Sequence, residues 1–334
     1  MKKYIVAFAA VASLSCGLAV SNVEAGNTIS FKSEKKVKLS DSEVKELSER
    51  LIDAVKQGET DQIDPLIMAG ADINYVDSYV VPRTALMWAA RKNNARMVDK
   101  LIECGANVNR GNKYGDTALM HAALYSDVCI VNKLITCGAD IKGKNNHGRT
   151  ALMWAAGGDN VEAVSFLFEK DANIHATDSN GNTLLHCATF RRVVNKEIVE
   201  FLISKGAEIN TKTNRGDTPL FLTVLGGDNK EIVELLIGKH ADVNALNNSG
   251  NTPLHFSLDN KEVTALLISN GANVYAKSNG DDTPRDIASQ KSLEVAKLVG
   301  EAANIQAPLN AMRNKGWGKL SNKRPHTNNN NNNQ

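Results

Sequence analysis

The chain has 334 residues, of which 42% are hydrophobic and 23% are charged, and its formal net charge is +2. This composition is typical of a globular protein and excludes a chain that is disordered throughout. Aromatic residues make up only 5% of the chain, so a single large aromatic core is not expected.

The N-terminus has the features of an export signal. Lys2 and Lys3 precede an apolar run from Tyr4 to Val20, and Val23-Glu24-Ala25 then fits a small-residue cleavage site. The run is too short, and too interrupted by Ser and Gly, for a membrane span. We therefore predict that residues 1–25 are a bacterial-type secretory signal peptide and that no transmembrane span remains after its removal.

An alternative address lies inside this segment. Leu14-Ser15-Cys16-Gly17 resembles a lipoprotein signal, in which Cys16 would carry a lipid, although the Leu stands one place too close to the Cys. The first interpretation predicts a periplasmic or extracellular protein. The second predicts a protein that is anchored to a membrane through Cys16.

The next segment, residues 26–40, is polar and is predicted to be a linker. Ser40 and Glu43 then form the sequence pattern of a capping box, which marks the start of a helix. Residues 41–80 are predicted to be the N-terminal cap of a repeat array that runs to residue 303. The apolar positions of the first helix follow helical spacing at Val44, Leu47, Leu51, Ile52 and Val55.

A seven-residue stretch is repeated at a fixed interval. TALMWAA occurs from Thr84 and again from Thr150, with TALMHAA from Thr117 midway, so that the copies lie 33 residues apart. Such a period is typical of stacked repeat architectures. The same register continues at Thr183, Thr218, Thr252 and Thr283, and it predicts repeats that start near residues 83, 116, 149, 182, 217 and 251.

Each unit contains two helical patterns and a turn. After Thr84 the residues Leu86, Ala89 and Ala90 share one face of a short helix. A second landmark, such as GANVN from Gly105, follows about 21 residues after each Thr, where a left-handed residue would end the second helix. The stripe of that second helix is Met97, Val98, Leu101 and Ile102, and the turn residues are Asn112 to Gly115.

These units resemble the ankyrin repeat, whose 33-residue unit carries T-P-L-H-x-A. The resemblance covers roughly Leu47 to Ala303. It implies an all-α solenoid of stacked helix-turn-helix units joined by β-hairpin-like turns, in which small Ala residues let neighbouring helices approach. Because a solenoid grows by addition, one elongated domain is expected. The chain departs from the motif at Ala85, Ala118 and Ala151, where Pro is usual, and at Met87, Met120 and Met153, where His is usual.

The array is predicted to end in a C-terminal cap, residues 282–303, because Pro284-Arg285-Asp286 replaces the apolar Leu of the motif. Residues 304–334 are basic and contain six consecutive Asn, so we expect a disordered tail. Without the signal and the tail, the repeats carry a charge of about −4. The tail would either hold an anionic partner or membrane surface, or be solvated without a partner.

Four cysteines remain after removal of the signal, an even number that export would allow to pair. Cys104 and Cys137 occupy the same position in adjacent units, and roughly 8–10 Å between neighbouring helices is beyond disulfide reach. Cys129 and Cys187 complete the set. We predict free thiols, and no pair has the spacing of a zinc site.

No motif of enzymatic chemistry is found: H-E-x-x-H, G-x-S-x-G and the P-loop are all missing from the sequence. We predict a protein that is not an enzyme and that has no cofactor and no metal. The resemblance implies that His186 and His255 bond Thr and backbone groups inside the repeat. Trp88 and Trp154 are equivalent, and packing is preferred to ligand stacking as their role.

In ankyrin repeats the turn tips and inner helices form a concave face that binds other proteins, so the resemblance implies a protein partner, with no nucleic acid expected and a monomeric chain. Tyr and Arg are the residue types that most often carry interface energy. The predicted binding residues are Lys113, Tyr114, Asp116, Asn146, His147, Arg149, Ser179, Asn180, Asn182, Asn214, Arg215 and Asp217 at the tips, and Arg91, Lys92, Leu124, Tyr125, Phe190 and Arg191 at the inner-helix ends.

The sequence therefore predicts an exported, non-enzymatic protein-binding scaffold, of which a host-directed effector is a special case. The alternative is a periplasmic or lipid-anchored accessory that protects or inhibits a cell-envelope enzyme. These interpretations share a fold and differ in the localisation of the protein after export.

Overall fold

The structure is a computed structural model that describes residues 39–170, 172–190, 194–227 and 229–314. Within these residues all regular structure is helical, as the repeat pattern predicted. The described chain divides into two compact units. The first unit comprises residues 39–190 and 194–208, and the second begins at Ile209.

The array begins with a long helix, α2 (Asp41–Gln57). The predicted capping box is confirmed: the Glu43 amide donates to Ser40 Oγ at 3.4 Å, and the Ser40 amide donates to Glu43 Oε2 at 2.8 Å. A 3-10 turn, η1 (Thr60–Gln62), and the short helix α3 (Ile63–Met68) complete the first helix pair. The helix α2 contacts both α3 and the first repeat helix, so it closes one end of the stack.

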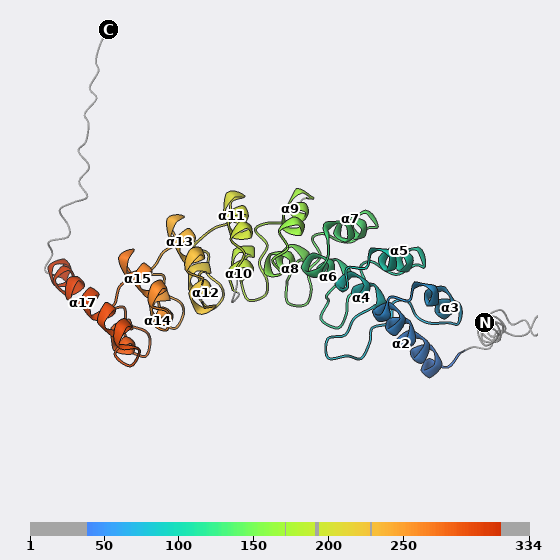
Figure 1. Cartoon of the computed structure of the whole chain (residues 1–334), viewed down its shortest axis with the longest axis horizontal. Helices are drawn as coiled ribbons and strands as arrows, with labels where there is room; N and C mark the ends of the chain where they lie inside the picture. Colours follow the sequence, from blue (N-terminus) through green and yellow to red (C-terminus); the bar gives the residue numbers. More distant parts are fainter. Residues whose placement is uncertain (1–38, 171, 191–193, 228, 315–334) are drawn as a thin grey trace, which may run out of the picture. The chain divides into compact units, whose positions relative to one another are not determined.

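In the first unit the inner helices α4, α6, α8 and α10 lie side by side in one layer, and the outer helices α5, α7, α9 and α11 form a second layer (Figure 1). Their bounds are α4 (Ala85–Arg91), α5 (Ala95–Glu103), α6 (Ala118–Tyr125), α7 (Val128–Thr136), α8 (Ala151–Gly157), α9 (Val161–Glu169), α10 (Leu184–Thr189) and α11 (Lys196–Ser204).

The repeated Thr is the N-cap of every inner helix of this unit. The Thr84 hydroxyl accepts from the Met87 amide at 3.2 Å, and Thr117, Thr150 and Thr183 make the equivalent bond. The side chain therefore satisfies a backbone donor that has no partner within the helix. The repeated motif is, in physical terms, a helix start.

Alanine lines the contacts between inner helices. Ala89 and Ala122 occupy equivalent places in adjacent inner helices, and both are fully buried. A methyl group at these positions lets the helix backbones approach closely, while Leu86 and its equivalents fill the layer between inner and outer helices. The predicted role of the small residues is confirmed.

The turns between helix pairs require glycine. Gly105 ends α5 with φ of 89°, as predicted, and Gly115 lies in the following turn with φ of 76°. A Cβ atom at Gly115 would lie 2.9 Å from the Asn146 amide nitrogen of the next turn. At Gly115, glycine is therefore needed both for the backbone of its own turn and for the close approach of the next turn.

The second unit repeats this arrangement with proline at the first position of each inner helix, where a missing N–H costs nothing. Its helices are α12 (Pro219–Leu225), α13 (Lys230–Gly238), α14 (Pro253–Ser257), α15 (Lys261–Ser269), α16 (Pro284–Ala288) and α17 (Leu293–Asn314).

The last helix runs past the predicted boundary of the array. We expected the ordered chain to end at Ala303, but α17 continues to Asn314, so the assignment of residues 304–314 to a disordered tail was wrong. The Gln306 side chain donates to Ala272 O at 2.8 Å and accepts from the Val274 amide at 3.0 Å. These bonds join the extension to the preceding repeat. The predicted signal peptide, most of the linker and residues 315–334 lie outside the described residues.

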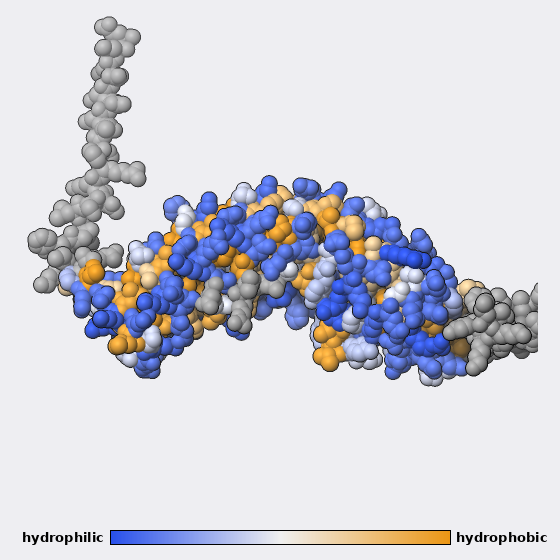
Figure 2. All heavy atoms as spheres, viewed as in Figure 1, coloured by the Kyte–Doolittle hydropathy of each residue, from blue (hydrophilic) through white to orange (hydrophobic). Residues whose placement is uncertain are grey.

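Hydrophilic residues cover much of the face seen in Figure 2, but hydrophobic atoms gather at the tip of the loop below α4 in that view. In this loop Val80 is 90% exposed and Val81 is 39% exposed. It is the first turn of the array, and it lacks the glycine that the later turns contain. Among the described helices, none combines the length and the apolar character that a membrane crossing requires.

Candidate functional site

Three turns of the first unit, those before α6, α8 and α10, are each closed by a side chain five residues before the N-cap Thr. Asn145 Oδ1 accepts from the backbone amides of His147 at 3.0 Å and Arg149 at 2.9 Å. Asn112 and Asp178 do the same in the neighbouring turns. The sequence analysis named Asn112 only as a turn residue and missed Asn145 and Asp178, although the constant spacing of all three from the Thr is a usable signal.

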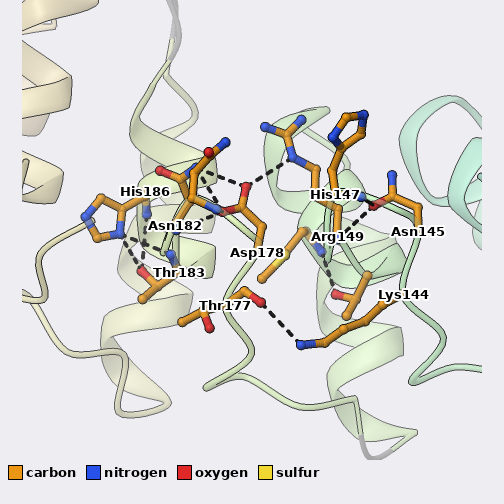
Figure 3. Close-up of polar contacts among 12 residues, drawn as sticks. Lys144, Asn145, His147, Arg149, Thr177, Asp178, Asn182, Thr183 and His186 are labelled. Atoms are coloured by element: carbon orange, nitrogen blue, oxygen red, sulfur yellow. Dashed lines mark hydrogen bonds and ion pairs between the residues drawn. The ribbon is translucent and has the colours of Figure 1, made fainter. Parts of the chain in front are cut away.

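Consecutive turns are joined to one another by side chains. Asn145 Nδ2 donates to Asp116 Oδ1 at 2.7 Å. Arg149 Nε donates to Asp178 Oδ2 at 3.3 Å (Figure 3). Burial would raise the pKa of the Asp178 carboxyl, but hydrogen bonds from Asn182, Asn180 and Arg149 together hold it below its usual value. The carboxylate therefore stays ionised and organises the turn.

This network corrects part of the predicted binding set. Asp116 and Asp217 are only 5% and 8% exposed, because each accepts a hydrogen bond from the next turn, at 3.0 Å from Asn247 Nδ2 in the case of Asp217. Asn146 Nδ2 donates to Lys113 O, and Asn182 Nδ2 donates to Asp178. Asp116 and Asp217 are thus buried turn residues rather than surface groups.

The structure brings two of the predicted tip residues together. The rings of Tyr114 and His147 are stacked, with centroids 6.5 Å apart and planes inclined by 27°, and Lys113 Nζ lies 5.0 Å from the Tyr114 ring centroid. Arg149, two residues after His147, is also exposed. The other exposed tip residues are Ser179, Asn180, Asn214 and Arg215, and the Ser179 amide donates to His147 O at 2.8 Å.

In three of the four inner helices of the first unit, an aromatic side chain lies one helical turn after the N-cap, whereas α10 has Cys187 there. This position holds Trp88 in α4, His121 in α6 and Trp154 in α8. His121 is 1% exposed, and its ring lies edge-on to Trp154 with centroids 5.3 Å apart. Within the described residues neither His121 nitrogen nor Trp154 Nε1 has a hydrogen-bond partner. Burial lowers the pKa of His121 to about 4, to which the charges of Arg83 and Arg91 contribute, so the ring is neutral at pH 7.

Cationic groups lie on the aromatic faces along this part of the molecule. The Arg83 guanidinium carbon is 4.6 Å from the Trp88 ring centroid, and that of Arg91 is 4.2 Å from the Tyr125 ring centroid. Lys56 Nζ is 3.8 Å from the Tyr79 ring centroid. We call these six residues, Lys56, Tyr79, Arg83, Trp88, Arg91 and Tyr125, the cationic–aromatic surface. The sequence analysis selected only Arg91 and Tyr125 from it.

The other predicted inner-helix residues lie beside this surface. An open depression of about 480 Å³ is lined by Leu124, Tyr125 and Gly158, among other residues. Lys92 is exposed, and Phe190 is 58% exposed at the end of α10. Arg191 lies outside the described residues. Tyr125 and Phe190 are therefore exposed at the ends of α6 and α10 in the first unit.

Comparison with known proteins agrees with this architecture. The family described as ankyrin repeats (3 copies) matches residues 51–145, 124–213, 190–278 and 220–308. The chain belongs to the ankyrin-repeat family. Among solved structures, the chain is similar to the human ASB11 ankyrin repeat domain, with 26% identity, a TM-score of 0.59 and coverage of 66% of this chain and 98% of that domain. No curated protein matches the chain.

Ankyrin repeats generally mediate protein–protein interaction, and the fold is typically a non-enzymatic scaffold. In this ankyrin array the histidines at the motif position have the structural role that was predicted: His186 Nδ1 lies 2.8 Å from Thr183 Oγ1, and His255 Nδ1 lies 2.9 Å from Thr252 Oγ1. Where the motif has Met instead, Met87 Sδ accepts from the Thr84 amide at 3.4 Å.

The cysteines of the array are free thiols, as predicted, in all four described positions. Burial raises the pKa of Cys187 to about 12, so this thiol stays protonated at neutral pH. Within the described residues, no cluster of His, Cys, Asp and Glu has an arrangement that would hold a metal ion.

Proposed function

We propose that the protein is an exported, non-enzymatic scaffold that binds a partner protein through the inner helices and turn tips of its first unit. The observation that carries this proposal is the cationic–aromatic surface, in which Arg91 lies over the exposed ring of Tyr125 and Arg83 lies over Trp88. Arg, Tyr and Trp are the residue types that dominate binding energy at protein interfaces.

The side chains of this surface are held in place before any partner arrives. Trp88 Nε1 donates to Asp77 Oδ2 at 2.7 Å, and the Trp88 ring is edge-on to Tyr79 with centroids 6.4 Å apart. Rotamers that are already ordered lose less conformational entropy on binding. Preorganised aromatic groups therefore support a binding role for this face over a purely packing role.

The proposal that the protein is exported rests on the sequence of residues 1–25 alone. Residues 14–17 favour a second candidate, a lipid-anchored accessory that protects or inhibits a cell-envelope enzyme. Fractionation of cells that produce the full chain distinguishes the two addresses: a soluble periplasmic or secreted product supports the first, and a membrane fraction that incorporates labelled lipid at Cys16 supports the second.

The binding proposal is tested by capturing partners with the chain and with a Tyr125→Ala variant. The matched control is Phe166→Ala, because Phe166 also lies beneath a cation, with Lys170 Nζ 5.3 Å from its ring centroid, but belongs to the outer helix α9. We expect Tyr125→Ala to weaken partner binding by about 2 kcal/mol, while the control retains it. Equal binding by all three proteins would contradict the proposal.

A further inference from the structure

We infer that Arg83 and Arg91 together form a receptor for a carboxylate, so that the partner is recognised through an acidic, extended peptide segment. This inference rests on the proposed function, since it names the chemistry of the segment that the cationic–aromatic surface would bind. Three features of the two arginines carry it: unused donors, uncompensated charge and apolar neighbours.

The first feature is the set of unused donors. A guanidinium that stacks its face on an aromatic ring keeps its in-plane N–H groups free for a ligand. Arg83 Nη1 donates to Val81 O at 3.1 Å, and Arg83 Nε, which is buried, has no hydrogen-bond partner among the described residues. Arg91 lies over the Tyr125 ring, and among the described residues its guanidinium has no hydrogen bond or ion pair. Forked donors of this kind match the two oxygens of a carboxylate.

The second feature is charge. Burial lowers the pKa of the Arg83 guanidinium, and the nearby charge of Arg91 lowers it further. Asp77 and Asp116 offset part of this repulsion, but both are buried and occupied by other donors. Asp77 accepts from Trp88 Nε1 and the Arg83 amide, and Asp116 accepts from Asn112 and Asn145. A carboxylate from outside would therefore relieve the repulsion between the two arginines.

The third feature is the apolar surroundings, which favour a peptide over a free anion. Trp88 and Tyr125 belong to adjacent inner helices, α4 and α6, and the exposed loop residue Val80 lies in the turn before α4. Neighbouring helices are roughly 8–10 Å apart, a distance that about three residues of extended chain span. A segment in which acidic and apolar side chains alternate would place carboxylates at the arginines and apolar groups on the rings.

The test measures binding of a fluorescein-labelled peptide of alternating glutamate and leucine to the full chain by fluorescence anisotropy. The variant is Arg83→Gln with Arg91→Gln. The matched control is Lys100→Gln with Lys133→Gln, which removes the same charge from the outer helices α5 and α7, where these lysines pair with Asp64 and Asp99. We expect the arginine variant to lose affinity by about tenfold or more and the control to stay within about twofold.

Each of the following results would overturn the inference: an equal loss of affinity in the lysine control, equal binding of the same peptide with lysine in place of glutamate, or binding of anionic lipid vesicles through the arginines without binding of the peptide. Because Arg83 also bonds its own loop, the single variant Arg91→Gln is measured too. This substitution should lower the affinity for the glutamate peptide several-fold while leaving the thermal melt unchanged. Unchanged affinity would overturn the inference.

The two proposals fail separately. If a captured partner is lost with Tyr125→Ala but retained with both arginines replaced, the scaffold function stands and the acidic ligand is wrong. If the arginines select the glutamate peptide but Tyr125→Ala leaves partner capture unchanged, the ligand chemistry stands and the assignment of this face to the partner is wrong.

Discussion

At the scale of single residues, His121 shows how a repeat position changes its chemistry with its occupant. Equivalent places hold Trp88, whose Nε1 donates to Asp77, and Trp154, whereas His121 is a buried base without a hydrogen-bond partner among the described residues. Burial lowers its pKa from 6.5 to about 4. The folded state therefore strongly prefers the neutral ring.

This preference predicts a loss of stability in acid. A base whose pKa is lowered by folding makes its full contribution to the free energy of unfolding above its unfolded pKa of 6.5. This stabilisation is lost as the pH falls toward 4. Between pH 7 and pH 4.5 we expect His121 to account for about 2 kcal/mol of the decrease in the free energy of unfolding. Urea denaturation of His121→Leu at both pH values should show a smaller decrease by that amount.

The control for this measurement is His147→Leu, since His147 is exposed at a turn tip. It should show the same acid loss as the natural chain. An equal acid loss in all three proteins would mean that the His121 ring is accessible to solvent in the folded state.

At the scale of elements, the stack depends on the close approach of inner helices. Ala122 is fully buried between α4 and α8, since α6 contacts both. Ala122→Leu should overpack this contact and lower the free energy of unfolding by roughly 1–3 kcal/mol. Denaturant melts would measure the change, with Ala95→Leu as the control at an exposed first position of α5. A loss below about 0.5 kcal/mol for Ala122→Leu would contradict the packing argument.

The extension of α17 gives a second prediction at this scale. Gln306 forms two hydrogen bonds with the preceding repeat, so a chain that ends at Ala303 should lose roughly 1–3 kcal/mol of stability in the second unit. A chain that ends at Asn314 keeps these bonds and should melt like the full chain. Thermal melts of the two truncations test this, and identical melts would show that residues 304–314 do not stabilise the array.

At the scale of the whole molecule, the localisation of the protein depends on its first residues. Lys2, Lys3, the apolar run and Val23-Glu24-Ala25 predict cleavage after Ala25. N-terminal sequencing of the exported protein should therefore begin at Gly26. Recovery of the chain with Met1 intact would contradict the prediction of export.

The sequence by itself determined the helix pairs, because each is specified locally by a capping Thr, an apolar stripe and a glycine that permits a left-handed turn. A motif that recurs every 33 residues carries the same local sequence signals each time, so the helices of one repeat can be predicted without knowledge of the neighbouring repeats. The capping roles of Thr84 and His186 were predictable for this reason.

Only the tertiary structure decided what each surface position does. The burial of Asp116 depends on Asn145 in the next turn, and the stacking of Arg91 on Tyr125 depends on the packing of α4 against α6. The extension of α17 likewise depends on Gln306 meeting the backbone of the preceding repeat. These contacts join residues from different repeats or distant positions, and a periodic sequence does not encode which neighbour a side chain meets, because its environment is completed only when the repeats stack.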